Sequence, residues 1–221
     1  MIIDNCTDIV SAMGNLQSGD IPQRLLETGT KQGDEFDVND YFKVLTHISM
    51  QDGYSLDYVY QTDFLGSLPL IYVRPESQAP YTSMKDVSAN IQRSDFREYR
   101  EVEDVEHGYF EYVVLSIVAN QFYLDWHANY SDTTIACSRK EINAIVESAS
   151  SGNFGVEMDR ARQAKPRAMK NIKPAVQLTD NGAVVEVIVF TKWGGFYRQT
   201  YTTSRSFPHT IVNSKSENIV P

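Results

Sequence analysis

The sequence predicts an α+β fold, in which helices cover one mixed, largely antiparallel sheet of about seven strands. Three observations predict this class. Apolar residues recur at helical spacing in three segments, near residues 39–50, 108–119 and 139–149. In other segments apolar and polar residues alternate, and turn residues separate those segments. The expected strands form two hairpins and one meander, at 54–60/68–74, 121–128/133–137 and 175–179/183–192/196–204.

The domain organisation follows from length and composition. A chain of 221 residues, of which 42% are hydrophobic, is long and apolar enough to bury a core. We therefore expect one α+β domain over residues 1–221. Polar residues dominate 76–107, and an acidic run closes that segment, so it is the place where the chain would divide into subdomains.

The N-terminal part combines helical spacing with a hairpin. Segment 39–50 follows Asp37, which suits a helix cap, and its apolar stripe consists of Tyr41, Val44, Leu45 and Ile48. Residues alternate with period two in 54–60, and 68–74 is the expected partner strand. Pro69 has no backbone N–H, so it indicates an edge strand or the position where a strand begins.

Residues 108–138 form the most apolar and aromatic stretch of the chain. Its first part, 108–119, is long for a strand, so we predict a buried helix there. From Phe122 the apolar period changes to two, which predicts strand 121–128. One face of that strand would carry Tyr123, Asp125 and His127, and the other Phe122, Leu124 and Trp126.

The clearest strand pattern lies in the last third of the chain. Asp180-Asn181-Gly182 and Trp193-Gly194-Gly195 are turn sequences that separate the three strands of the meander. The polar tail from 213 to 221 is expected to be loosely ordered. Ahead of the meander, Ser138 and Glu141 fit a capping box that begins helix 139–149.

The charge balance limits the classes of partner. The chain has 20 basic and 29 acidic residues, a net charge of −9, which repels the phosphate backbone and argues against nucleic-acid binding. Segment 160–173 reverses this sign, with six bases and no acid. A solvated face is the ordinary interpretation of such a run, and pairing with the acids of 95–106 or with an acidic ligand is the alternative. No apolar run approaches the roughly 18 residues of a membrane span.

The sequence shows no pattern for a cofactor or metal. It contains no nucleotide-binding, metalloprotease or serine-hydrolase motif, and its four histidines are scattered. Cys6 and Cys137 lie far apart and outside any CxxC pattern, so we expect reduced thiols and a cytoplasmic protein. A Cys6–Cys137 disulfide is the alternative, for which the sequence holds no pattern.

The function that these patterns favour is a non-catalytic binding or interaction module with an aromatic sheet face. Its partner would be another protein or a small ligand, and a homo-oligomer is one form of such an assembly. The expected contact residues are Tyr123, Trp126, Trp193, Tyr197, Arg198 and Arg205.

The alternative is a small hydrolase or transferase that works through Asp125 and His127. Two residues apart on a strand, their side chains would share a face, and the carboxylate could orient the imidazole as a general base. Arg198 or Arg205 would position an anion. The same alternation is also typical of an ordinary solvent-facing sheet surface.

Overall fold

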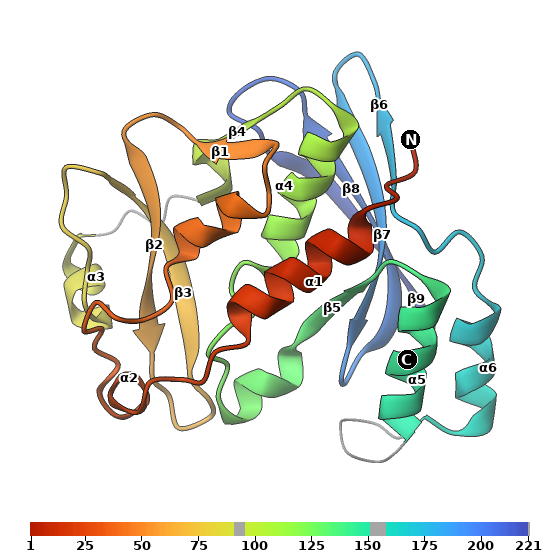
Figure 1. Cartoon of the computed structure of the whole chain (residues 1–221), viewed down its shortest axis with the longest axis horizontal. Coiled ribbons are helices and arrows are strands. Elements are labelled where there is room, and N and C mark those ends of the chain that lie inside the picture. Colours follow the sequence, from red (N-terminus) through yellow and green to blue (C-terminus); the bar gives the residue numbers. More distant parts are fainter. Residues whose placement is uncertain (91–95, 151–157, 221) are drawn as a thin grey trace.

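The computed structural model describes residues 1–90, 96–150 and 158–220, and it confirms the α+β class (Figure 1). Within these ranges all strand pairing is antiparallel. The single sheet expected from the sequence is wrong, because the strands form three separate sheets. Two are two-stranded: β1 (Ile48–Met50) with β4 (Arg100–Val102), and β2 (Tyr54–Gln61) with β3 (Leu68–Pro75).

The largest sheet contains the predicted meander. Strands β6 (Ala175–Leu178), β7 (Gly182–Thr191) and β8 (Gly195–Ser204) pair in sequence order, as expected. Strand β5 (Thr133–Ala136) also pairs with β7, beyond the end of β6. The polar tail, predicted to be loose, is instead β9 (Ile211–Val220), which pairs with β8 along its length. Backbone hydrogen bonds to β8 order this tail although its side chains are polar.

Strand β7 is central because both of its faces are covered. Val185, Val187 and Val189 are buried in the main core, while Ile188 points to a second cluster formed with α5. Both faces therefore bury apolar side chains, as expected for a central strand, although Glu186 on the side of Ile188 is partly exposed.

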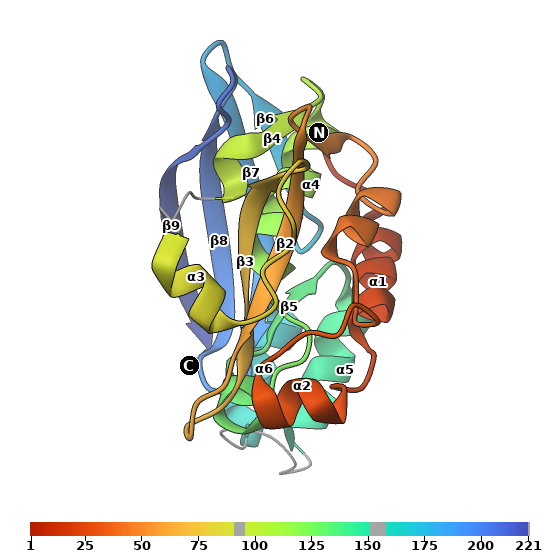
Figure 2. The ribbon, with the colours of Figure 1, turned by 90° about the vertical axis from the view of Figure 1, so that its left-hand side faces the viewer.

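Helix α4 (Glu106–Val118) confirms the predicted buried helix. Every residue from Gly108 to Leu115 is buried, which explains why its apolar residues do not form a single stripe. It packs on β5, β6 and β7, and α1 (Cys6–Gln17) lies beside it (Figures 1 and 2). The main core cluster includes side chains from α4, β2 and β7.

Cys6 and Cys137 form a disulfide, so the expectation of reduced thiols is wrong. The sequence separation of 131 residues hides the pair, which α1 and the end of β5 bring together. Disulfides are typical of oxidising compartments, which removes the cysteine argument for a cytoplasmic location.

Helix α5 (Arg139–Ser150) also confirms a prediction, with one change at its start. The Glu141 N–H donates to Ser138 Oγ at 3.3 Å, as in a capping box. The Glu141 carboxylate accepts from the Cys137 N–H. Thr7 of α1 donates to the other oxygen of the same carboxylate, so Glu141 links the two helices beside the disulfide.

The predicted helix over 39–50 is wrong beyond its first turns. A 3-10 helix, η1 (Val38–Lys43), begins at the Asp37 cap, and the chain then becomes β1. The buried carboxylate of Glu111 accepts hydrogen bonds from the His47 backbone N–H and lies 2.7 Å from His47 Nδ1. This contact and pairing with β4 extend the chain where the apolar spacing alone predicts helix.

The predicted strand 121–128 is also wrong, and with it the hairpin 121–128/133–137. Tyr123 and Trp126 have φ angles of 51° and 47°, which end any extended run. The chain forms a 3-10 helix, η3 (Trp126–Ser131), and β5 pairs with β7 instead.

The remaining helices lie at the periphery. The segment expected as a connector, 76–107, holds α3 (Met84–Asn90), the 3-10 helix η2 (Phe96–Tyr99) and β4. Helices α2 (Gln23–Thr28) and α6 (Arg160–Ala168) complete the described elements. Arg139 of α5 donates to three carbonyls at the end of α6, those of Pro166, Arg167 and Met169.

Candidate functional site

Four aromatic rings form a row on the surface, which we call the aromatic row: Trp126, His127, Tyr130 and Trp193. The ring centroids of neighbours lie 4.1, 5.5 and 5.6 Å apart in that order. Both tryptophan side chains are 55% exposed. Large aromatic rings normally bury most of their area in the core, so their exposure together marks a surface that suits a partner.

The pairing of β5 with β7 brings the row together. Helix η3 directly precedes β5, and Trp193 lies in the turn directly after β7, so the antiparallel pair places them side by side. Lys192 then ties the turn to η3, since its Nζ donates to the Asn129 carbonyl at 3.1 Å and to Asp132 Oδ2 at 2.7 Å.

The backbone under Trp126 is held in a costly conformation. Its φ of 47° lies in the left-handed region that side chains other than glycine rarely adopt. Gly66, in the turn between β2 and β3, packs directly against η3. A Cβ at Gly66 would lie 2.6 Å from the Ala128 N and 2.8 Å from the Asp125 carbonyl oxygen. The turn and η3 therefore fit closely, and the Asp125 N–H donates to the Ser67 carbonyl at 3.0 Å.

The same turn adds apolar surface next to η3. Phe64 is 81% exposed and Leu65 is 54% exposed. Asp63 precedes Phe64 and Asp125 precedes Trp126 in the sequence, while Asp132 is paired with Lys192. The 63–66 turn and the aromatic row thus combine exposed apolar rings with acidic residues nearby in the sequence.

The structure separates the predicted pair Asp125 and His127. Asp125 is a half-buried residue at the start of η3, and His127 is an exposed member of the row. Within the described ranges no hydrogen bond or ion pair joins their side chains. Burial, and then the charge of Asp125, raise the pKa of the Tyr60 hydroxyl to about 12. The negative charge of Asp125 therefore acts on a core tyrosine.

Among the other predicted contact residues, Tyr197 lies next to the row, because a Cβ at Gly194, the neighbour of Trp193, would meet the Tyr197 hydroxyl at 2.5 Å. Tyr123 is buried, and its hydroxyl accepts from the Phe36 N–H at 3.1 Å. Tyr197 packs on the main core, and Arg198 pairs with Glu186 on the sheet. Arg205 pairs with Asp104 at 2.7 Å, and this contact holds the pKa of that carboxyl below its usual value.

The sequence left open whether the basic segment 160–173 pairs with the acids of 95–106. The ion pair described for this segment joins Lys173 to Asp4 instead, at 2.7 Å. The segment's side chains on α6 point to solvent, as in Arg160, Arg162, Lys165 and Arg167.

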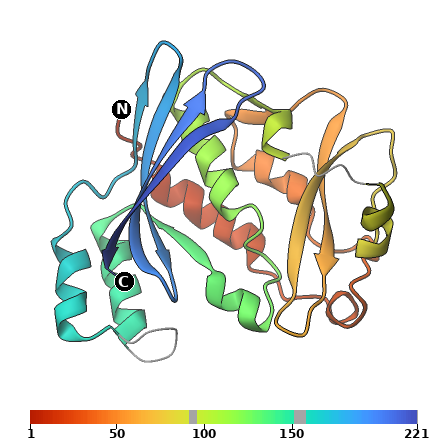
Figure 3. The same ribbon diagram turned by 180° about the vertical axis from the view of Figure 1, so that it is seen from behind.

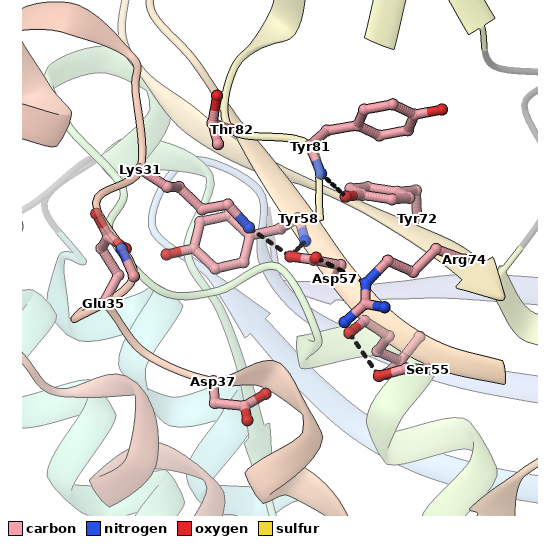
Figure 4. A network of polar contacts seen from close by, with 12 residues as sticks. Lys31, Glu35, Asp37, Ser55, Asp57, Tyr58, Tyr72, Arg74, Tyr81 and Thr82 are labelled. Carbon is pink, nitrogen blue, oxygen red and sulfur yellow. Dashed lines mark hydrogen bonds and ion pairs between the residues drawn. The ribbon is translucent and has the colours of Figure 1, made fainter. Parts of the chain in front are cut away.

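A second polar centre, which the sequence interpretation missed, lies at the outer edge of β2. The buried carboxylate of Asp57 is contacted by Lys31 Nζ, by Arg74 Nε at 3.1 Å and by the Tyr58 N–H at 2.7 Å (Figure 4). Lys31 also lies over the Tyr58 ring, 4.6 Å from its centroid. The sequence did contain a signal for this centre, because Asp57 is a charged residue within an aromatic strand, and a buried charge needs partners.

This centre lines a pocket of about 380 Å³. The lining also contains Glu35, whose two oxygens accept from the Gln32 and Gly33 N–H groups. Asn39 also lines the pocket. Its side chain accepts a hydrogen bond from the Leu56 N–H and donates one to the Leu56 carbonyl, as the backbone of a neighbouring strand would. The network thus fixes the 31–39 segment on β2.

Over residues 1–90, 96–150 and 158–220, no cluster of three or more His, Cys, Asp or Glu side chains could hold a metal ion. None of the helices in these ranges has the length and apolar character needed to cross a membrane. Comparison with family models, with curated proteins and with solved structures finds no match.

Proposed function

We propose that this protein is an interaction module whose aromatic row binds a basic, arginine-containing segment of a partner protein. The observation that carries the proposal is the row itself, in which Trp126 and Trp193 are each 55% exposed and joined through two further rings. Tryptophan and tyrosine dominate the binding energy of protein interfaces, because they bring large rigid surfaces with few rotatable bonds.

The charge of the surface supports a basic partner. Asp63 precedes Phe64 and Asp125 precedes Trp126 in the sequence, Asp132 is paired with Lys192, and the whole chain carries a net charge of −9. A guanidinium group stacks on the face of an aromatic ring and is attracted by its quadrupole. Nucleic acids present the same stacking surfaces but would be repelled by this charge. A basic peptide satisfies both features.

His127 is exposed and lies between two aromatic rings. This position favours a role in the binding surface over a role as a general base. Trp126 and Tyr130 flank its ring at 4.1 and 5.5 Å. A base would need Asp125 to orient the imidazole, and within the described contacts that bond is lacking. An unchanged peptide affinity in His127→Ala, combined with a hydrolytic activity that this variant loses, would favour the enzyme instead.

Intrinsic fluorescence tests the proposal directly, because the chain has 2 tryptophans and both lie in the row. Titration with an arginine-rich peptide is expected to change the emission, and a glutamate-rich peptide of equal length is expected to leave it unchanged. Calorimetry then compares Trp126→Ala and Trp193→Ala with the parent chain. We expect each to weaken binding about tenfold or more, as for interface hot spots.

Phe207→Leu provides a matched control. Phe207 is 49% exposed and lies beyond the far end of β8, roughly 30 Å of strand away from Trp193. Its replacement should leave the affinity unchanged. Equal binding of both peptides, or equal losses from Phe207→Leu and the two tryptophan variants, would show that attraction is only general and would overturn the proposal.

A further inference from the structure

Strand β9 forms the outer edge of the five-stranded sheet (Figure 3). Within the described part of the chain it pairs on one side only, with β8. All side chains from Val212 to Asn218 are exposed, so both faces of the strand are open to solvent. An edge of this length presents a row of backbone donors and acceptors to any strand that approaches it.

The sequence of β9 is self-complementary in one antiparallel register. When a strand pairs with its own copy about a two-fold axis perpendicular to the sheet, opposite residues lie on the same face. The axis must therefore pass through a residue position. An axis at Ser216 places Lys215 of each copy opposite Glu217 of the other, and Ser214 opposite Asn218.

We propose that two copies of this chain associate through β9, as antiparallel strands with Ser216 on the two-fold axis. The sheet then continues from one copy into the other, and the symmetry forms two Lys215–Glu217 pairs. An opposite-charge pair directly across two strands is stabilising.

The neighbouring registers are less favourable for a simple reason. An axis at Lys215 would place that lysine opposite itself, and an axis at Glu217 would do the same with the glutamate. Like charges directly opposite each other destabilise a strand pair. The charges of β9 therefore favour the register centred on Ser216 over these two neighbours.

The basic helix α6 does not prevent this association. It contacts β9, whose Ile219 packs on the second core cluster near the end of the strand. In the proposed register Asn218, next to Ile219, lies opposite Ser214 of the other copy, so the two α6 helices approach opposite ends of the paired strands. The two Ile219 positions are separated by about six residues along the strand direction, roughly 20 Å. At 0.1 M salt this distance is about two Debye lengths, so the repulsion between the two basic α6 helices is largely screened.

Cysteine cross-linking tests both the association and its register. The chain has 2 cysteines, both in the Cys6–Cys137 disulfide, so an introduced cysteine is the one free thiol. In Ser216→Cys the two symmetry-related Cβ atoms would lie about 5 Å apart, close enough for rapid disulfide formation on mild oxidation. In Ser214→Cys the two thiols would be displaced by about four residues, roughly 13 Å, and should cross-link at least tenfold more slowly.

Charge reversal in the full chain gives an independent measurement. Lys215→Glu places like charges opposite each other in both pairs, so sedimentation should show at least a fivefold weaker dimer. Adding Glu217→Lys restores opposite charges and should restore the dimer. Thermal unfolding of the dilute variants checks that each monomer is folded. A chain that stays monomeric at high concentration, equal cross-linking of the two cysteine variants, or a double variant as weak as Lys215→Glu would overturn the proposal.

Discussion

Cys6, the first residue of α1, is bonded through its sulfur to Cys137, which directly follows β5. The bond closes a loop with a sequence separation of 131 residues, and both half-cystines are buried. A cross-link of this span restricts the unfolded chain strongly. We expect the paired variant Cys6→Ala/Cys137→Ala to lower the free energy of unfolding by about 2–5 kcal/mol, measured by urea denaturation.

Reduction of the parent chain provides the control for this prediction. A reagent that reacts with free thiols should detect none in the folded, oxidised protein. After reduction and unfolding it should detect two, since the chain has 2 cysteines. Identical urea midpoints for the oxidised and reduced protein would contradict the prediction.

The second prediction concerns the buried carboxylate of Asp57. It pairs with both Lys31 and Arg74, whose side chains are 11% and 17% exposed. Removing one member of a buried charge network leaves the others uncompensated. We expect Asp57→Ala to destabilise the protein by about 3–5 kcal/mol in urea denaturation.

An exposed ion pair offers the matched control. Lys173 and Asp4 are 2.7 Å apart, with side chains 58% and 79% exposed. Asp4→Ala should change stability by less than about 1 kcal/mol, because solvent screens such pairs. A loss for Asp4→Ala as large as that for Asp57→Ala would show that burial does not set the cost.

The third prediction is a loss of stability in alkali. Burial raises the pKa of the Tyr60 hydroxyl from 10.0 to about 12, and that of Tyr109 likewise to about 12, where Asp104 also contributes. A raised pKa in the folded state means that the unfolded chain releases these protons first. The stabilisation is complete below pH 10 and is lost as pH rises toward 12. Urea midpoints should fall across that window, and tyrosinate absorbance should show a late-titrating fraction. A flat midpoint would contradict it.

Local patterns predicted those elements whose own residues determine them. The meander was predictable because Asp180-Asn181-Gly182 forms a turn between alternating segments. Helix α4 was predictable from its length. The strand over 121–128 fails for a different reason. Its alternation is real, but the left-handed conformations of Tyr123 and Trp126, held by tertiary contacts such as that of Gly66, override it.

The candidate site was predictable only in part. Trp126 and Trp193 were identified as contact residues by type, and both are exposed. Their connection through Tyr130 depends on the pairing of β5 with β7, two strands that lie some fifty residues apart in sequence, and a single sequence does not reveal such pairing. Tyr123 was expected as a contact residue as well, and its ring is buried instead.

The last prediction separates the stability of the site from its binding. Trp126 has a φ of 47°, where any side chain with a Cβ costs about 1 kcal/mol relative to glycine. Because the ring itself is 55% exposed, its removal costs little packing. We expect Trp126→Gly to be about 1 kcal/mol more stable than Trp126→Ala in urea denaturation, and both to lose peptide binding equally. This outcome would mean that the fold accepts a strained residue at this position in order to present the ring. If Trp126→Ala is the more stable of the two, the left-handed backbone is not a constraint on this position, and the argument that the ring is held outward for binding fails.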